Sequence, residues 1–221
     1  MRILVTRPEP GASATASRLV TMGHEPAVAP CLEIVSLPLR LPENVGALII
    51  TSAQSIPPLP ERWRGVPMFC VGDATANRAR AAGFSRVESA GGDARGLLRL
   101  VCARRLPGTH LLAAGERQGM ALAQKLHAAG LSVLRRKVYA ARPMRVLPPD
   151  IAADLAAEKI PVALFYSAET ARAFVRLRPC NTASITAYAL SPVVAAGLGG
   201  LPWATIRVAV APTEADLMAL L

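Results

Sequence analysis

Short segments rich in serine, threonine, glycine and proline recur along this 221-residue chain, each directly after an apolar run. Hydroxyl side chains in such places cap the helices that follow, and the N–H groups of a helix's first turn bind carboxylates and phosphates. The segments therefore suit an anionic ligand, although any strand–helix turn uses the same residue types. Both interpretations stay open at this point. The segments are TRPEP (6–10), TSAQS (51–55), VGDAT (71–75), AGERQ (114–118), YSAET (166–170), LSP (190–192) and APTE (211–214).

Tyr139 offers a different chemistry. Alternation along the strand-like segment 133–140 places it on one face with Arg135 and Lys137, opposite Val138. A phenol among basic side chains could donate a proton to a leaving group or a hydrogen bond to an anion. A buried core tyrosine is the alternative.

Other catalytic signatures are absent from the sequence. It has no G-x-G-x-x-G, P-loop, H-E-x-x-H or G-x-S-x-G motif, and its three histidines are isolated. The four cysteines are scattered without a C-x-x-C pair, which favours small buried hydrophobes over a metal site or disulfides and fits a reducing cytoplasm. We expect no metal and no cofactor, so any catalysis would depend on positioning and electrostatics.

Apolar runs of four to six residues must supply the strands that position these segments. Most are followed by an amphipathic helical stretch, the pattern of parallel βα units. In the helix after Glu116, for example, Leu122, Leu126 and Ala129 share one face, and Gly130 supplies a stop. The predicted strands are 3–6, 47–51, 68–71, 111–114, 162–166, 185–190 and 206–210.

The units form two permuted copies of one pattern. ALIITSAQS matches ALFYSAETA, FCVGDATANRARAAGF matches YALSPVVAAGLGGL, and RVESAGGDARGLLRL matches RVAVAPTEADLMALL. The remaining unit, which begins HLLAAGERQG, finds its partner at the N-terminus, in RILVTRPEPG. The ordered pairings predict two similar α/β domains, the first of them discontinuous.

The permutation requires the chain to cross between the domains twice. We predict a first domain of residues 1–35 and 142–221, a second of 40–135, and linker strands at about 32–37 and 133–140 that pair antiparallel. Prolines flank both crossings, as linkers often show. Two domains on such a hinge could aim two sets of helix N-termini at one multiply anionic ligand.

Composition agrees with this architecture. Hydrophobic residues make up 52% of the chain and aromatic residues only 4%, so the core must consist mainly of small aliphatic side chains, as in α/β layers. No apolar run reaches the roughly 18 residues of a membrane span, and the opening MRILVTRPEP lacks a signal peptide's apolar region. The net charge of +10 fits either a basic surface that only aids solubility or an anionic partner such as a nucleic acid, a phosphate or a polycarboxylate. Dispersed basic residues and few aromatics favour a small ligand over a nucleic acid.

The chain resembles the uroporphyrinogen-III synthase family. The matching motifs follow the family's order and cover nearly the whole chain, so their specificity comes from the ordered set. They are LVTRPEP (4–10), P-x-x-E-I (30–34), TSA (51–53), VGDATA (71–76), AAGF (81–84), L-x-x-x-G-x-x-V-x-x-x-x-V-Y (126–139), FYSA (165–168) and ALSP (189–192).

The resemblance implies an activity and a fold. The fold would be two similar flavodoxin-like domains on a two-stranded antiparallel linker. The activity would be cyclisation of hydroxymethylbilane, a linear tetrapyrrole with eight carboxylates, to uroporphyrinogen III, with inversion of the last ring, loss of water and a spiro intermediate. The resemblance also implies a cytoplasmic monomer of tetrapyrrole biosynthesis without cofactor, and is compatible with transient handover of the bilane from hydroxymethylbilane synthase.

Site residues carry over from the family's motifs position by position. Tyr139 would help the hydroxyl leave, and Thr75 after the glycine turn would be a second catalytic residue. The substrate-binding residues would be Arg7, Pro8, Ser52, Ala53, Gly72, Gly115, Ser167, Ala168 and Ser191.

Two departures from the family's pattern keep an alternative open. Val193 and Val194 stand where many members have a threonine after the ALSP motif, and the proline-rich segment 56–60 interrupts the helix expected after Ser52. The missing hydroxyl motivates a second hypothesis, a non-catalytic two-lobed protein that binds or senses an anionic small molecule. A nucleic-acid-binding module, suggested by the charge alone, is a third.

Overall fold

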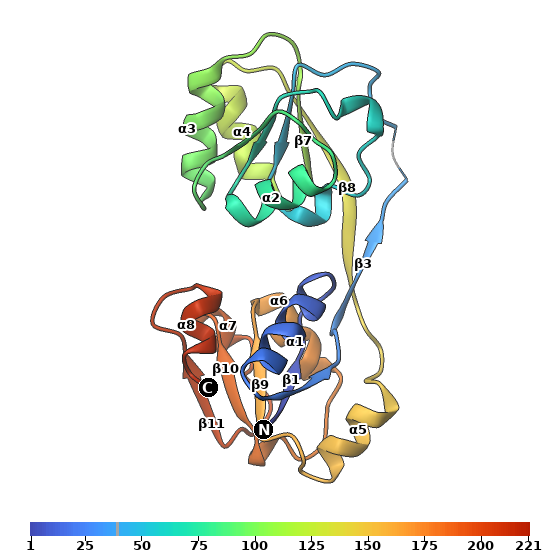
Figure 1. Ribbon diagram of the computed structural model, residues 1–221, viewed down its shortest axis with the longest axis vertical. Coiled ribbons are helices and arrows are strands. Elements are labelled where there is room, and N and C mark those ends of the chain that lie inside the picture. The colour runs from blue at the N-terminus through green and yellow to red at the C-terminus, as the bar shows by residue number, and fades with distance from the viewer. Residues whose placement is uncertain (39) are drawn as a thin grey trace. The chain divides into compact units, whose positions relative to one another are not determined.

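The computed structural model describes residues 1–38 and 40–221. Contacts between residues divide the chain into two compact units (Figure 1). Unit 1 contains Met1–Glu33 and Arg142–Leu221, and unit 2 contains Ile34–Ala141. Unit 1 is thus assembled from both ends of the chain, and unit 2 from the middle.

The sheet of unit 1 is parallel. Its strands are β1 (Arg2–Val5), β2 (Glu25–Val28), β9 (Val162–Phe165), β10 (Thr186–Ala189) and β11 (Thr205–Val208), in the order β2-β1-β9-β10-β11. Counted along the chain within the unit this is 2-1-3-4-5, the order of flavodoxin-like folds. β1 and β9 lie side by side near the centre, so the turns that leave their carboxyl ends are neighbours.

Helices of unit 1 pack on this sheet through small and aliphatic side chains. They are α1 (Gly11–Thr21), α5 (Pro149–Ala156), α6 (Ala168–Arg176), α7 (Pro192–Ala196) and α8 (Glu214–Met218), with a 3₁₀ helix, η3, at Thr182–Ser184. In α6, Ala171, Ala173 and Phe174 are buried, and the Phe174 ring meets Phe165 edge-on at 5.3 Å. In α8, Leu217 and Met218 enter the core formed by β1 and β9.

Unit 2 repeats the arrangement and adds the linker pair. Its sheet contains β3 (Leu32–Ser36), β4 (Ala47–Ile50), β5 (Met68–Cys70), β6 (Val87–Ser89), β7 (His110–Gly115) and β8 (Val133–Pro143), in the order β3-β8-β7-β4-β5-β6. The first two residues of β3 and the last two of β8 belong to unit 1. Its helices are α2 (Asp73–Ala81), α3 (Ala94–Arg104) and α4 (Met120–Ala128), with the 3₁₀ helices η1 (Ala53–Ser55) and η2 (Glu61–Trp63).

Buried residues of β4 alternate between two cores. Leu48 and Ile50 join the cluster under α2, and Ala47 and Ile49 join the cluster under α3 and α4. Both faces of the sheet are therefore covered, which explains why the strand reads as a continuous apolar run rather than as an alternating one.

The strand orders confirm the permuted repeat. When β7, β8, β4, β5 and β6 are set on β1, β2, β9, β10 and β11, as the predicted pairing of the copies requires, β8-β7-β4-β5-β6 coincides with β2-β1-β9-β10-β11. The two parallel sheets therefore share one topology, entered by the chain at different points.

β3 and β8 form the antiparallel linker pair. The Leu37 N–H donates to the Val138 carbonyl at 3.1 Å, and the Met144 N–H donates to the Cys31 carbonyl at 3.0 Å. From the first pair to the second, the residue number falls from 37 to 31 on one strand and rises from 138 to 144 on the other, which is the register of antiparallel strands. The predicted linker strands at about 32–37 and 133–140 correspond to β3 and to a β8 that continues to Pro143.

Two local features differ from a simple reading of the apolar runs. The edge strands β2 and β6 are not among the predicted strands, because Glu25–Val28 contains a proline and Val87–Ser89 is only three residues long. After Ser52 the described segment 53–67 forms η1 and η2 rather than an α-helix. This agrees with the interruption expected from prolines, which lack a backbone N–H and clash with the preceding turn.

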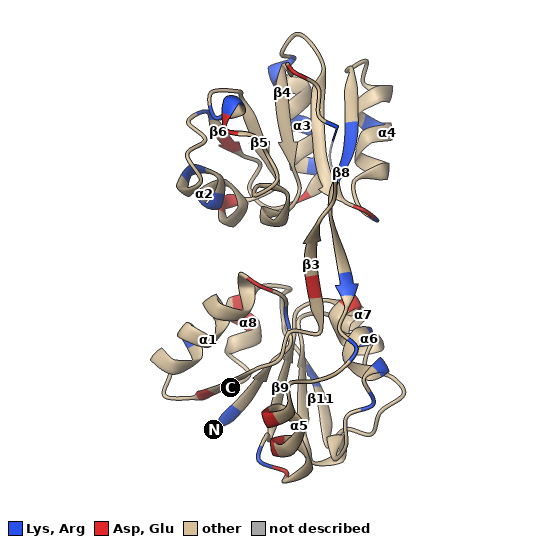
Figure 2. Ribbon diagram, turned by 90° about the vertical axis from the view of Figure 1, so that its right-hand side faces the viewer, with Lys and Arg blue, Asp and Glu red and all other residues tan. Residues whose placement is uncertain are grey.

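Charged residues are distributed over both units (Figure 2). The basic run Arg135-Arg136-Lys137 lies on β8, and the first two of these side chains are half-buried. Among the described residues, no helix combines the length and the apolar character that a membrane span needs.

Candidate functional site

Arg7 begins the site of unit 1 where the chain leaves β1. Thr6 is buried, and its hydroxyl donates to the Leu164 carbonyl at 2.7 Å, which ties the end of β1 to β9. The Arg7 guanidinium then lies over the Tyr166 ring, 4.1 Å from the ring centroid. Glycine at position 11 leaves space for the guanidinium in this position, because a Cβ there would lie 2.8 Å from Cζ of Arg7. The turn between β1 and α1 is therefore built around the arginine side chain.

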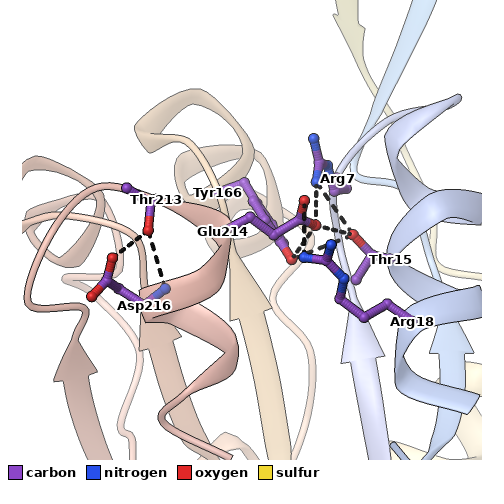
Figure 3. Close-up of polar contacts among 7 residues, drawn as sticks. All are labelled: Arg7, Thr15, Arg18, Tyr166, Thr213, Glu214 and Asp216. Carbon is purple, nitrogen blue, oxygen red and sulfur yellow. Dashed lines mark hydrogen bonds and ion pairs between the residues drawn. The ribbon is translucent and has the colours of Figure 1, made fainter. Parts of the chain in front are cut away.

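Four side chains converge on the carboxylate of Glu214 (Figure 3). Arg7 Nη1 donates to Glu214 Oε1 at 3.2 Å, and Arg18 Nη1 lies 3.6 Å from Oε2. The hydroxyls of Thr15 and Tyr166 each donate to Oε1 at 3.2 Å. We call these five residues the Glu214 cluster. They come from the end of β1, from α1, from the end of β9 and from the start of α8.

Tyr166 stays protonated in this cluster. Burial raises the pKa of its phenol above the ordinary value, and the nearby Glu214 carboxylate raises it further, while the hydrogen bond from Thr15 and the charge of Arg7 oppose the shift. The neutral phenol is thus favoured because its ionised form would lose water and face a like charge. Tyr166 can therefore donate to a carboxylate across the neutral pH range.

The hydroxyls predicted at other strand ends of unit 1 are helix caps. Ser167 Oγ accepts the Thr170 N–H at 3.1 Å at the start of α6, whose first residue is Ala168. Ser191 Oγ accepts the Val194 N–H at 3.4 Å at the start of α7. Capping is thus the role that their contacts display, and a role in substrate binding stays a prediction.

Two further residues of unit 1 serve the turns around the site. Pro8 accepts the Ala12 N–H through its carbonyl at 3.2 Å, which starts α1. Thr213 caps α8 by accepting the Asp216 N–H at 3.1 Å and also donates to the Asp216 carboxylate (Figure 3). The cap holds the first turn of α8 and, with it, the backbone of Glu214.

Ser52 and Ala53 occupy the corresponding strand end in unit 2. Ser52 has extended backbone angles, and its Oγ accepts the Gln54 N–H at 3.3 Å, so it caps η1, which begins at Ala53. Only a single 3₁₀ turn follows. Ser52 therefore does not present the N-terminus of an α-helix, in contrast to Ser167.

Gly72 and Thr75 lie where β5 leads into α2. Gly72 is the residue before the helix, and a Cβ there would lie 3.1 Å from Cα of Gly92, so glycine lets two loops approach closely. Thr75 is in the first turn of α2 and is only 8% exposed. Its predicted catalytic role stays a prediction.

Tyr139 and Gly115 are brought together by the pairing of β7 and β8. The Tyr139 phenol donates to Gln118 Oε1 at 2.9 Å, and the side chain is 5% exposed. Its ring lies directly over Gly115, where an added Cβ would be 2.8 Å from the ring carbon Cζ. Gly115 therefore provides the space that the ring fills.

The predicted grouping of Tyr139 with the basic side chains is wrong. The β7–β8 register shifts between Ala114 and Gly115, and Tyr139 enters the same core cluster as Val138. The shift interrupts the alternation from which the grouping was predicted. Arg135 instead donates to the carbonyls of Gly115, Glu116 and Gln118 at 2.7–3.1 Å. It thereby holds the loop that presents Gln118 to the phenol.

Each unit therefore assembles one polar site at the carboxyl ends of its strands. The sequence does not single out Tyr166, Glu214 or Gln118. It contains them only within the turn segments YSAET, APTE and AGERQ. Thr15 and Arg18 are missed, although their spacing of three places them on one face of α1. The sequence feature that could have indicated their place in the cluster is Arg7, which lies in the turn directly before α1.

Comparisons with known proteins agree on one family. A family model described as "Uroporphyrinogen-III synthase HemD" matches residues 13–219. A uroporphyrinogen-III synthetase structure from Helicobacter pylori is similar, with 19% identity, a TM-score of 0.66 and coverage of 100% of this chain and 98% of that chain. A mutant uroporphyrinogen III synthase from Thermus thermophilus is similar, with 17% identity, a TM-score of 0.54 and coverage of 100% and 97%. No curated protein matches the chain. At these identities the structural likeness concerns the fold.

Proposed function

Because the chain belongs to the uroporphyrinogen-III synthase family, we propose that it cyclises hydroxymethylbilane to uroporphyrinogen III with release of water. The observation that carries this proposal is the family match over residues 13–219. The flavodoxin-like strand order of both units supports it. The enzyme is a cyclising hydro-lyase of tetrapyrrole biosynthesis, and nothing in the site favours the non-catalytic alternative.

We expect the substrate to bind through the positive charge of the chain and through backbone N–H groups at the starts of helices. Hydroxymethylbilane carries eight carboxylates, and the chain has a net charge of +10. Ser167 accepts one first-turn N–H of α6, and the other first-turn N–H groups have no partner within the helix and suit a carboxylate. Arg7 adds a guanidinium at a neighbouring strand end, where it can pair with a carboxylate oxygen.

Loss of the hydroxyl is the step assigned to Tyr139. The pyrrole nitrogen's electron pair expels the hydroxyl as the phenol proton moves to its oxygen, so that water leaves and an azafulvene that is still protonated on nitrogen forms beside the tyrosinate. The phenol is already a hydrogen-bond donor, to Gln118 at 2.9 Å. Gln118 is exposed, so a rotation of its side chain would let the substrate's hydroxyl replace it. The tyrosinate is then neutralised by a proton that the substrate releases later.

Formation of the inverted isomer requires positioning more than proton transfer. The free bilane closes by itself to the uninverted isomer, so the enzyme must bring the inner carbon of the terminal ring into attack to form the spiro intermediate. The ring then opens and recloses in the inverted sense. Holding several of the substrate's carboxylates restricts the bilane's conformations before the reaction, which is catalysis by orientation.

Isomer analysis tests the proposal directly. Hydroxymethylbilane would be generated in situ by its synthase, the purified chain added, and the products oxidised and resolved by chromatography. We expect uroporphyrin III to dominate and its fraction to rise with protein concentration. Isomer I alone, at every protein concentration, would refute the proposed activity.

A further inference from the structure

We propose that Arg7, Thr15, Arg18 and Tyr166 form a carboxylate-binding site that Glu214 fills and that a carboxylate of the substrate takes over. This deepens the proposed function, on which the identity of the ligand rests. The ligand class is a polycarboxylate. Glu214 is thus an internal competitor that weakens binding until it is displaced.

The chemistry of the site is that of a carboxylate receptor. Two guanidinium groups and two hydroxyl groups point at one carboxylate, with donor–acceptor distances of 3.2 Å for Arg7, Thr15 and Tyr166 (Figure 3). The stacking of Arg7 on the Tyr166 ring fixes the direction of the guanidinium. Glu214 itself demonstrates that a carboxylate fits this geometry.

Solvent reaches the site, so a dissolved ligand can enter it. The side chains of Arg7, Glu214 and Arg18 are 28%, 38% and 51% exposed. Ion pairs with such exposure contribute little to stability because water and salt screen them. An incoming carboxylate therefore exchanges with Glu214 at small cost.

Glu214 can leave without unfolding the helix that carries it. It is the first residue of α8, which is held by the Thr213 cap and by the buried Leu217 and Met218. None of these contacts involves the Glu214 side chain, so rotation of that side chain into solvent leaves the backbone in place. The displaced carboxylate stays close to the anionic ligand and continues to oppose it through like charge.

The site lies where the proposed substrate needs a partner. Arg7 and Tyr166 follow the adjacent strands β1 and β9 at their carboxyl ends, which is the ligand-binding edge of parallel α/β sheets. Tyr166 immediately precedes Ser167, the cap of α6. One substrate carboxylate at the cluster would place a second one near the start of that helix.

Neutralising Glu214 is the decisive perturbation. Glu214→Gln keeps the shape of the side chain and removes its charge. We expect it to tighten binding of benzenehexacarboxylate, measured by calorimetry, by about two- to fivefold, and to lower KM for hydroxymethylbilane by a similar factor. Both the gain in affinity and the decrease in KM should become smaller as the salt concentration is raised.

Glu25→Gln is the matched control. Glu25 pairs with Arg2 at the amino end of the same sheet, so its removal changes the net charge of unit 1 equally without touching the cluster. We expect unchanged affinity for benzenehexacarboxylate. In an Arg7→Gln background, Glu214→Gln should lose most of its effect, because the site then lacks its central cation.

The outcomes separate this proposal from the proposed function. Equal or weaker binding by Glu214→Gln, or equal tightening by Glu25→Gln, overturns the competitor role even if the wild-type chain forms isomer III. A wild-type chain that forms only isomer I refutes the synthase activity, while tighter benzenehexacarboxylate binding by Glu214→Gln would still support the carboxylate site. A thermal melt of each variant identifies any unfolding.

Discussion

Replacement of Gly115 by alanine would force the Tyr139 ring out of its present position. The added Cβ would lie 2.8 Å from Cζ, 3.0 Å from Oη and 3.1 Å from Cε2 of the ring. Carbon atoms pack at about 3.5–4.0 Å, so the ring must move by roughly 0.7 Å. The ring is rigid and sits in a core, and it cannot relieve this contact by bending.

The size of the effect follows from two losses. A shift of that size away from Gln118 would stretch the present 2.9 Å hydrogen bond beyond the usual range. The lost bond costs about 0.5–1.5 kcal/mol, and overpacking of a core costs about 1–3 kcal/mol. We expect Gly115→Ala to lower the free energy of unfolding by about 2 kcal/mol and to slow isomer III formation at least tenfold, since proton transfer by a positioned side chain contributes about 10²–10⁴-fold.

Urea unfolding and the isomer assay together measure both effects. Gly65→Ala is the control, because among the described residues other than its two chain neighbours no heavy atom lies within 4 Å of a Cβ at that position, and its backbone is not left-handed. It should fold with unchanged or slightly raised stability and wild-type activity. If Gly115→Ala has the wild-type unfolding midpoint and the wild-type rate, the close approach to Tyr139 does not constrain the site, and the reasoning fails.

Three further predictions concern the remaining contacts. Tyr139→Phe should slow isomer III formation by about 10–100-fold without abolishing it, because positioning survives the loss of a proton donor; an unchanged rate would remove the assigned role. Gly11→Ala should raise KM in the isomer assay and leave the urea midpoint nearly unchanged, because the three atoms nearest to the added Cβ all belong to the flexible head of Arg7; an unchanged KM would contradict this. Burial raises the pKa of the Cys31 and Cys70 thiols to about 12, so at pH 8 both should resist iodoacetamide in the folded chain and react in urea, as read by mass spectrometry; rapid modification of the folded chain would contradict this.

Periodicity and the internal repeat were sufficient to predict the topology. The strands at 47–50 and 162–165 are apolar throughout because both faces of a central parallel strand are covered, and such runs are visible without any tertiary information. The antiparallel linker followed from the permutation. The edge strand Val87–Ser89 was not recognised because a short, half-buried strand leaves little periodic signal.

The sequence was also sufficient to predict that the serines at the strand ends cap helices. It did not establish whether they bind the substrate. Ser167 and Ser191 precede helices in sequence, and a cap depends on neighbours only two or three residues away. By contrast, Tyr139 was assigned to the wrong face. Strand alternation predicts a side chain's direction only while the register holds, and the shift beside Gly115 depends on a partner strand more than 20 positions away in the chain.

The sequence by itself therefore determined the family, the doubled α/β topology and the strand ends at which chemistry could occur. These features depend on local secondary-structure propensity and on the order of the strand–helix units, and both can be determined from the sequence alone. Only the tertiary structure decided which side chains meet there. Glu214 lies 207 positions after Arg7, and the two pair because α1, which follows β1, and α8, which follows the edge strand β11, both begin at the carboxyl edge of the same parallel sheet. A contact between such distant residues is a property of the packed sheet, and no pattern of spacing encodes it.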